Sequence, residues 1–124
     1  MSLLLDTHTL LWLVQDSHHL GPNTRTALLA GQSTVSAITV WEIAIKRAAG
    51  RLRIPDVVPF LDDMGFALLS LSAVHAEEAG GLPMHHRDPF DRALVAQARL
   101  EGLVLVTVDR MMPSYDVALL DASR

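Results

Sequence analysis

The sequence predicts an α/β fold in which helices cover both faces of a mostly parallel sheet of about five short strands. Short apolar runs alternate along the chain with segments of helical periodicity, and this alternation implies crossover connections between parallel strands. The 124 residues suit a single domain spanning residues 1–124. Half of the residues are hydrophobic and 19% are charged, so the chain can build a packed core.

Five apolar segments are predicted to form the strands. The first covers Leu3–Leu5 and ends at Asp6, and a later one covers Leu103–Val108 and ends at Asp109. The others are predicted at residues 34–37, 66–71 and 117–120. Helices are predicted between them, at residues 10–16, 22–29, 39–49, 56–64, 72–79 and 88–100, with proline or glycine near most of their ends.

Composition excludes several classes of protein. The chain has no cysteine, which excludes disulfides, cysteine-based zinc sites and thiol catalysis. The formal charge of −4 argues against nucleic-acid binding through basic surface alone. The first residues lack the basic region of a signal peptide, and no apolar stretch is long enough to span a bilayer. We therefore expect a cytoplasmic protein that does not associate with membranes.

Acidic residues follow the predicted strands. In open α/β sheets, ligands bind beyond the carboxyl ends of the strands. Asp6 and Asp109 directly follow two strands, Glu42 lies near the start of the helix after a third, and Asp88 and Asp91 begin the helix at Pro89. The topology is therefore expected to gather these carboxylates at one edge of the sheet.

Taken singly, each acid also has a structural interpretation, and capping is so common that this is the more frequent explanation. Thr39 and Glu42 have the spacing of a capping box. Asp88 before a proline fits an N-cap, with Asp91 favoured in the first turn by the helix dipole. The two acids that follow strands can be turn residues.

Taken together, the acids favour a cation site. Carboxylates gathered at one sheet edge repel one another unless a cation offsets their charge. Ligands that are all oxygen favour Mg²⁺ or Mn²⁺ over zinc. Such a site can activate water and stabilise the charge that develops on a phosphodiester. The residues alone therefore point to metal-assisted hydrolysis of phosphodiesters.

Three segments resemble the PIN domain of VapC-type toxins from type II toxin–antitoxin modules. They are LLLDTHTLLWLV, TVSAITVWEIAIK and HHRDPFDRALVAQARLEGLVLVTVD, and the resemblance runs from Leu3 to about Leu119. It implies a three-layer α/β/α fold and an endoribonuclease dependent on Mg²⁺ or Mn²⁺. Such an enzyme cleaves transfer or ribosomal RNA to arrest translation. A cognate VapB-type antitoxin and a homodimer are the implied partners.

The resemblance also implies a set of catalytic residues. By position, the acidic site falls on Asp6, Glu42, Asp91 and Asp109. Asp6 and Asp91 are the expected direct metal ligands, while Glu42 and Asp109 hold a second ion or position water. Asp88 is expected mainly to cap its helix, and joining the pocket is its alternative role. Further accessory residues are expected at Thr7 and Thr107, through hydrogen bonds to water or substrate.

Basic residues near the acids are candidates for RNA phosphate contacts. Three adjoin the proposed acids in sequence, and others form a basic run that could equally be a solvated helix end. The candidates are Arg87, Arg92, Arg110, Lys46 and Arg47. Phe90 shares a helix face with Leu94 and is expected to pack in the core rather than stack on a base.

The remaining alternatives are a zinc enzyme, a phosphoreceiver-like signalling domain and a non-catalytic PIN-like binding module. Two pairs of histidines are consecutive, His18–His19 and His85–His86, and each pair is poorly placed to chelate one ion. The histidines therefore carry little information about the site. His8 follows the first acid closely and could line the site. A phosphoreceiver needs a late lysine that the chain lacks. A binding module is expected to have lost some of the four acids, and all four are present.

Overall fold

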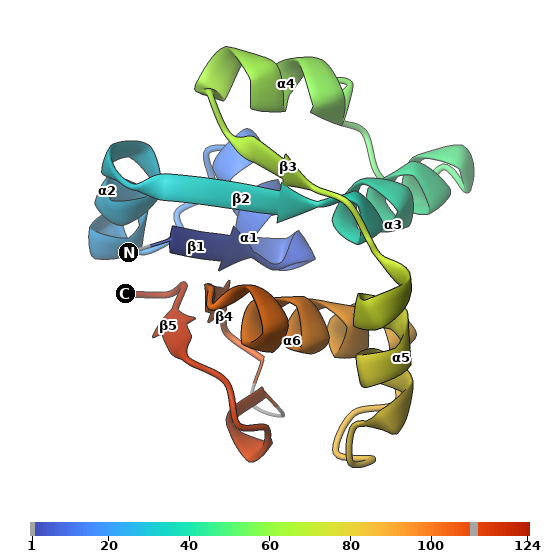
Figure 1. Cartoon of the computed structure of the whole chain (residues 1–124). Helices are drawn as coiled ribbons and strands as arrows, with labels where there is room; N and C mark the ends of the chain where they lie inside the picture. Colours follow the sequence, from blue (N-terminus) through green and yellow to red (C-terminus); the bar gives the residue numbers. More distant parts are fainter. Residues whose placement is uncertain (1, 110–111) are drawn as a thin grey trace.

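The sheet predicted from the sequence is present and entirely parallel. The structure is a computed structural model that describes residues 2–109 and 112–124. Within them, one sheet has the strand order β3-β2-β1-β4-β5 (Figure 1). Its strands are β1 (Ser2–Leu5), β2 (Gln32–Ser36), β3 (Ala67–Leu69), β4 (Val104–Thr107) and β5 (Leu119–Asp121). Each lies within two residues of a predicted apolar segment or inside it.

The central strand β1 has apolar side chains on both faces. Leu4 is aligned with Thr34 of β2 and Leu105 of β4. Leu3 and Leu5 belong to one hydrophobic cluster and Leu4 to a second, and all three are buried. Because successive side chains of a strand point to opposite faces, a strand covered on both sides needs an uninterrupted apolar run.

The helices form the two outer layers of a three-layer α/β/α fold. The first cluster takes residues from α1 (Thr7–Val14), α2 (Pro22–Ala30) and α4 (Val57–Met64). The second takes residues from α6 (Pro89–Glu101), with Ala79 of α5 (Ala73–Gly81) packed against it. The helix α6 lies in front of the sheet and α1 behind it (Figure 1). No helix in the described part of the chain is long and apolar enough to cross a membrane.

The helix α3 (Ala37–Ala48) differs from the prediction at its start. Ser36, the last residue of β2, caps it by accepting a hydrogen bond from the Ile38 amide at 3.1 Å. Thr39 therefore lies inside the helix, and the predicted capping box with Glu42 was wrong. With Ser36 as its cap, the helix begins at Ala37, two residues before the predicted start at residue 39. The Glu42 carboxylate is therefore not used in capping and is available for contacts with other elements. The short 3₁₀ helix at Met112–Ser114 was also not predicted.

Candidate metal centre

Asp6 connects the end of β1 to the start of α1. Its carboxylate accepts a 2.8 Å hydrogen bond from the Thr9 amide and so caps α1. The Thr9 hydroxyl in turn donates to the Val106 carbonyl of β4 at 2.9 Å. Burial raises the pKa of the Asp6 carboxyl, although hydrogen bonds from Thr107 and Thr9 oppose this effect. Capping therefore holds a buried carboxylate at the edge of the sheet.

Three of the four predicted catalytic acids line one cavity. Asp6 lies after β1, Asp91 lies in the first turn of α6, and Asp109 lies after β4. The parallel topology brings the carboxyl ends of β1 and β4 together, as predicted. The cavity has a volume of about 370 Å³ and is lined by Asp6, His8, Trp12, Asp91, Val108 and Asp109. The expectation that His8 lines this site is confirmed.

The carboxyl group of Asp91 is strongly perturbed by its surroundings. Burial raises its pKa from 3.8 to about 7, with further upward contributions from the charges of Asp88, Asp109 and Glu42. The charge of His86 acts in the opposite direction. Desolvation and like charge therefore disfavour the ionised form, which a bound cation would favour.

Asp88 caps α6, as predicted. Its Oδ1 accepts a 2.8 Å hydrogen bond from the Phe90 amide, and Pro89 occupies the first helical position. The side chain of Asp88 is thus engaged at the helix end, while its charge still acts on Asp91.

Glu42 approaches the acids from α3. Its Oε1 accepts a 2.6 Å hydrogen bond from the Thr7 hydroxyl, and its Oε2 lies 3.2 Å from Lys46 Nζ. The other predicted accessory residue, Thr107, accepts a 3.0 Å hydrogen bond from the Asp109 amide and also bonds Asp6. Both threonines therefore contact the acids themselves.

His86 is a site residue that the sequence analysis missed. Its Nε2 lies 2.8 Å from Asp109 Oδ2 and 3.1 Å from Asp91 Oδ2. The expectation that the histidines carry little information was therefore wrong for this one. The local sequence gives no signal, because the contact depends on the approach of β4 to α6. The argument that consecutive histidines diverge is confirmed, since the His85 ring packs on Tyr115 at 5.1 Å.

The residues of this site fit a divalent cation. Carboxylate oxygens of Asp91 and Asp109 and a ring nitrogen of His86 all lie within 4.8 Å of one another. The carboxylate oxygens match the preference of Mg²⁺ and Mn²⁺ for oxygen. The pKa of Asp91 is raised first by burial and then by neighbouring negative charge, and a bound cation would oppose both effects. Asp6 is outside this three-residue group but lines the same cavity.

Arg92 is not an RNA contact, and that prediction was wrong. The residue is 8% exposed, and its guanidinium donates to backbone carbonyls at the end of α5 and in the connection to α6. The acceptors are the carbonyls of Ala79, Gly80, Leu82, Pro83 and His86, at 2.8–3.4 Å. Arg92 thus fastens this connection onto α6, because it supplies donors to carbonyls that the end of α5 leaves unpaired.

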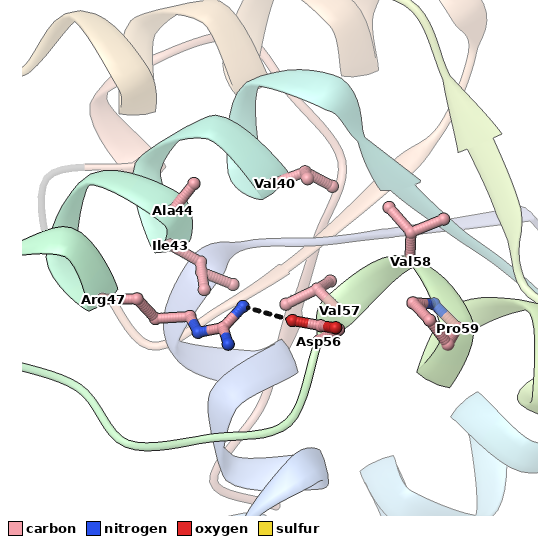
Figure 2. A pocket seen from close by; sticks show the side chains of 8 residues that line it. All are labelled: Val40, Ile43, Ala44, Arg47, Asp56, Val57, Val58 and Pro59. Carbon is pink, nitrogen blue, oxygen red and sulfur yellow. Dashed lines mark hydrogen bonds and ion pairs between the residues drawn. The ribbon is translucent and has the colours of Figure 1, made fainter.

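Arg47 lies in a different pocket from the acids. Figure 2 shows its guanidinium directed at Asp56, with 2.9 Å between Nη1 and Oδ1. This pocket between α3 and α4 has a volume of about 320 Å³ and includes none of the four predicted catalytic acids. Arg110 lies outside the described residues.

A groove beside the acids combines apolar and basic side chains. Its volume is about 520 Å³, and it is lined by Glu42, Ile45, Lys46, Arg51, Arg87, Asp88, Pro89 and Phe90. Phe90 is partly buried against the second cluster, in agreement with its predicted packing role, and meets Trp41 edge-on at 5.4 Å. Lys46 and Arg87 thus share one groove with Glu42, and their contacts with RNA phosphates stay a prediction.

The fold and the acidic cavity define an α/β protein with a candidate cation site at the carboxyl edge of its sheet. The model of the PIN domain matches residues 3–118, and the chain therefore belongs to the PIN-domain family. A search of curated proteins found no match.

Solved structures share this fold at low sequence identity. A chain of a toxin–antitoxin complex from Klebsiella pneumoniae matches with a TM-score of 0.68 and 21% identity, covering 97% of both chains. VapBC2 from Rickettsia felis, bound to a DNA fragment from its promoter, matches with a TM-score of 0.72 and 15% identity, covering 97% of this chain and 98% of the other. FitAcB from Neisseria gonorrhoeae matches with a TM-score of 0.61 and 20% identity, covering 98% of both chains.

Proposed function

We propose that the chain is a metal-dependent endoribonuclease. The observation that carries this proposal is the convergence of Asp6, Asp91 and Asp109 on one cavity, where the pKa of Asp91 is raised to about 7. Folding gathers these charges at a cost, so a ligand that offsets them is the simplest reason to keep them. Membership of the PIN family supports the same assignment.

The chain's own residues hold the site and receive the substrate. Asp91 and Asp109, with Asp6 at the same cavity, would hold the cation. A bound Mg²⁺ or Mn²⁺ supplies activation of water and stabilisation of charge on the phosphodiester. Glu42, oriented by Thr7, adds negative charge that favours the cation. Lys46 and Arg87 line the adjoining groove, where they meet the phosphates of the RNA strand.

The biological role is that of a toxin in a type II toxin–antitoxin module. Structures of toxin–antitoxin complexes cover nearly the whole of this chain, which supports the role. In this proposal the enzyme acts in the cytoplasm, cleaves transfer or ribosomal RNA, and forms a homodimer that a VapB-type antitoxin neutralises.

The enzymatic proposal is tested with purified protein and total RNA. Cleavage is expected with Mg²⁺ or Mn²⁺ and is expected to stop with EDTA. Asp91→Asn should abolish cleavage, whereas Asp63→Asn, an exposed acid of α4, should leave it unchanged. Cleavage that persists in EDTA or in Asp91→Asn contradicts the proposal, and an intact fold without cleavage favours a binding module.

A further inference from the structure

The hydrogen bonds of the His86 ring define which of its nitrogens carries the proton. The Asp88 amide donates to His86 Nδ1 at 3.2 Å. A ring nitrogen that accepts a hydrogen bond has no proton, so the neutral ring carries its proton on Nε2. That Nε2–H group faces Asp109 Oδ2 at 2.8 Å and Asp91 Oδ2 at 3.1 Å.

This tautomer makes His86 a hydrogen-bond donor to the carboxylates and not a metal ligand. A histidine that binds a metal uses an unprotonated nitrogen and donates through its other N–H group. In His86 the second nitrogen faces a backbone donor, which is the reverse arrangement. A single donor between two carboxylates also offsets part of the repulsion that would separate them.

The backbone of His86 is fixed on both sides. Its amide donates to Tyr115 Oη at 2.8 Å, and its carbonyl accepts from Arg92 Nη1 at 3.2 Å. Tyr115 and Arg92 are themselves buried, and Tyr115 Oη also donates to the Pro83 carbonyl at 3.1 Å. The backbone that carries the ring is therefore held by residues of two other segments, independently of the two carboxylates.

We propose that His86 is a positioning residue of the acidic centre, whose Nε2–H group holds the carboxylates of Asp91 and Asp109 together at one cation site. The hydrogen bond to Asp109 Oδ2 and the 3.1 Å contact with Asp91 Oδ2 engage one oxygen of each carboxylate and so fix the direction of its other oxygen. Partners of this kind, one step removed from a metal, commonly change affinity by roughly 10- to 100-fold. The inference deepens the proposed function and rests on it for the identity of the cation.

Mn²⁺ binding to the metal-free full-length protein, measured by calorimetry, tests the donor role. His86→Ala is expected to weaken binding by about tenfold or more. His86→Gln can present an amide N–H in place of Nε2–H and is expected to recover most of the affinity. His18→Ala is the matched control, because His18 is exposed and does not line the acidic cavity, and it should bind like the wild type.

Two results of calorimetry overturn the inference. Wild-type affinity in His86→Ala removes the positioning role, and equal loss in His86→Gln and His86→Ala removes the donor role in favour of direct ligation. The melting temperature of each variant is measured as well. If His86→Ala loses stability as a whole, the Mn²⁺ affinity of His86→Gln relative to the wild type tests the donor role.

Nuclear magnetic resonance separates this inference from the proposed function. Long-range ¹H–¹⁵N spectra of the metal-free protein should show the Nε2–H tautomer of His86, and its Nε2 signal should move in Asp109→Asn. An Nδ1–H tautomer, or an unmoved signal, overturns the inference. Wild-type protein that binds no Mn²⁺ or cleaves no RNA contradicts the proposed function instead, and these spectra still decide the donor role.

Discussion

The Thr7 hydroxyl donates a 2.6 Å hydrogen bond to Glu42 Oε1, which joins the first residue of α1 to the middle of α3. Thr7 directly follows the capping residue Asp6, so two consecutive residues at the start of α1 fix the positions of Asp6 and Glu42. Glu42 is thereby held by α1 as well as by its ion pair with Lys46. The position of a catalytic candidate on one helix depends on a hydroxyl from another.

Replacing the Thr7 hydroxyl should therefore affect stability and cleavage together. Thr7→Val keeps the shape and removes the donor, and a hydrogen bond to a charged group contributes about 1.5–3 kcal/mol. We expect a loss of about 1–2 kcal/mol in the free energy of unfolding, because Lys46 still pairs Glu42. Urea denaturation and RNA cleavage rates measure both effects. Thr7→Ser keeps the hydroxyl and is the control, so an equal loss in Thr7→Ser would contradict the role of this hydrogen bond.

Metal-free protein should lose stability as the pH rises towards neutrality. The pKa of Asp91 is 3.8 in its ordinary state and about 7 in the folded protein, so the native state holds this proton more tightly. The resulting stabilisation is complete below about pH 4 and is lost as the pH rises through about 7. Asp91→Asn lacks this titration. In EDTA, the melting temperature of Asp91→Asn minus that of the wild type should therefore increase between pH 4 and 8. A difference that stays constant over this range would contradict the raised pKa of Asp91.

Adding Mn²⁺ should reverse that loss in the wild type alone. A ligand that binds only the folded state raises its stability. At pH 8, where Asp91 is ionised, the melting temperature of the wild type should rise with Mn²⁺ concentration. That of Asp91→Asn should change little, and an equal rise in both proteins would place the ion elsewhere.

The two candidate functions of Asp88 are separable by substitution. Asparagine caps helices about as well as aspartate, whereas alanine costs roughly 1 kcal/mol. Asp88→Asn should therefore keep wild-type stability and most RNA cleavage, and Asp88→Ala should lose about 1 kcal/mol in urea denaturation. Because the charge of Asp88 raises the pKa of Asp91, the asparagine variant should also titrate Asp91 at a lower pH. Cleavage lost as completely as in Asp91→Asn would instead make Asp88 a metal ligand.

Arg92 should matter for folding more than any exposed arginine. Arg92→Ala removes a buried guanidinium that donates to five carbonyls, with a fully buried hydrogen bond to that of Leu82. A hydrogen bond to a charged group contributes about 1.5–3 kcal/mol, so we expect a total loss of about 3 kcal/mol or more. Arg99→Ala, which breaks a surface contact with Glu78 at 3.8 Å, should cost less than about 1 kcal/mol. Chemical denaturation compares the two. An Arg92→Ala protein that is fully stable but binds RNA weakly would restore the phosphate contact expected from sequence.

Local sequence was sufficient wherever neighbouring residues decide the structure. The apolar run Leu3–Leu5 predicts a strand covered on both faces, and Asp88 before proline predicts a helix cap; both are present. Asp6 and Asp109 could be assigned to one edge because parallel strands end on the same side. The gathering of three acids on one cavity follows from that rule and from the start of α6.

Tertiary structure alone decided the hydrogen-bond partners of the polar side chains. Arg92 follows an acid and reads as a phosphate contact, yet it is buried because the end of α5 presents unpaired carbonyls to it. In the sequence, nothing distinguishes His86 from the adjacent His85. In the fold, Tyr115 and Arg92 fix the His86 backbone beside Asp91 and Asp109. Sequence patterns determine which faces are apolar and where elements begin, whereas a hydrogen bond depends on ångström-scale approach between distant segments, which only the packed fold provides.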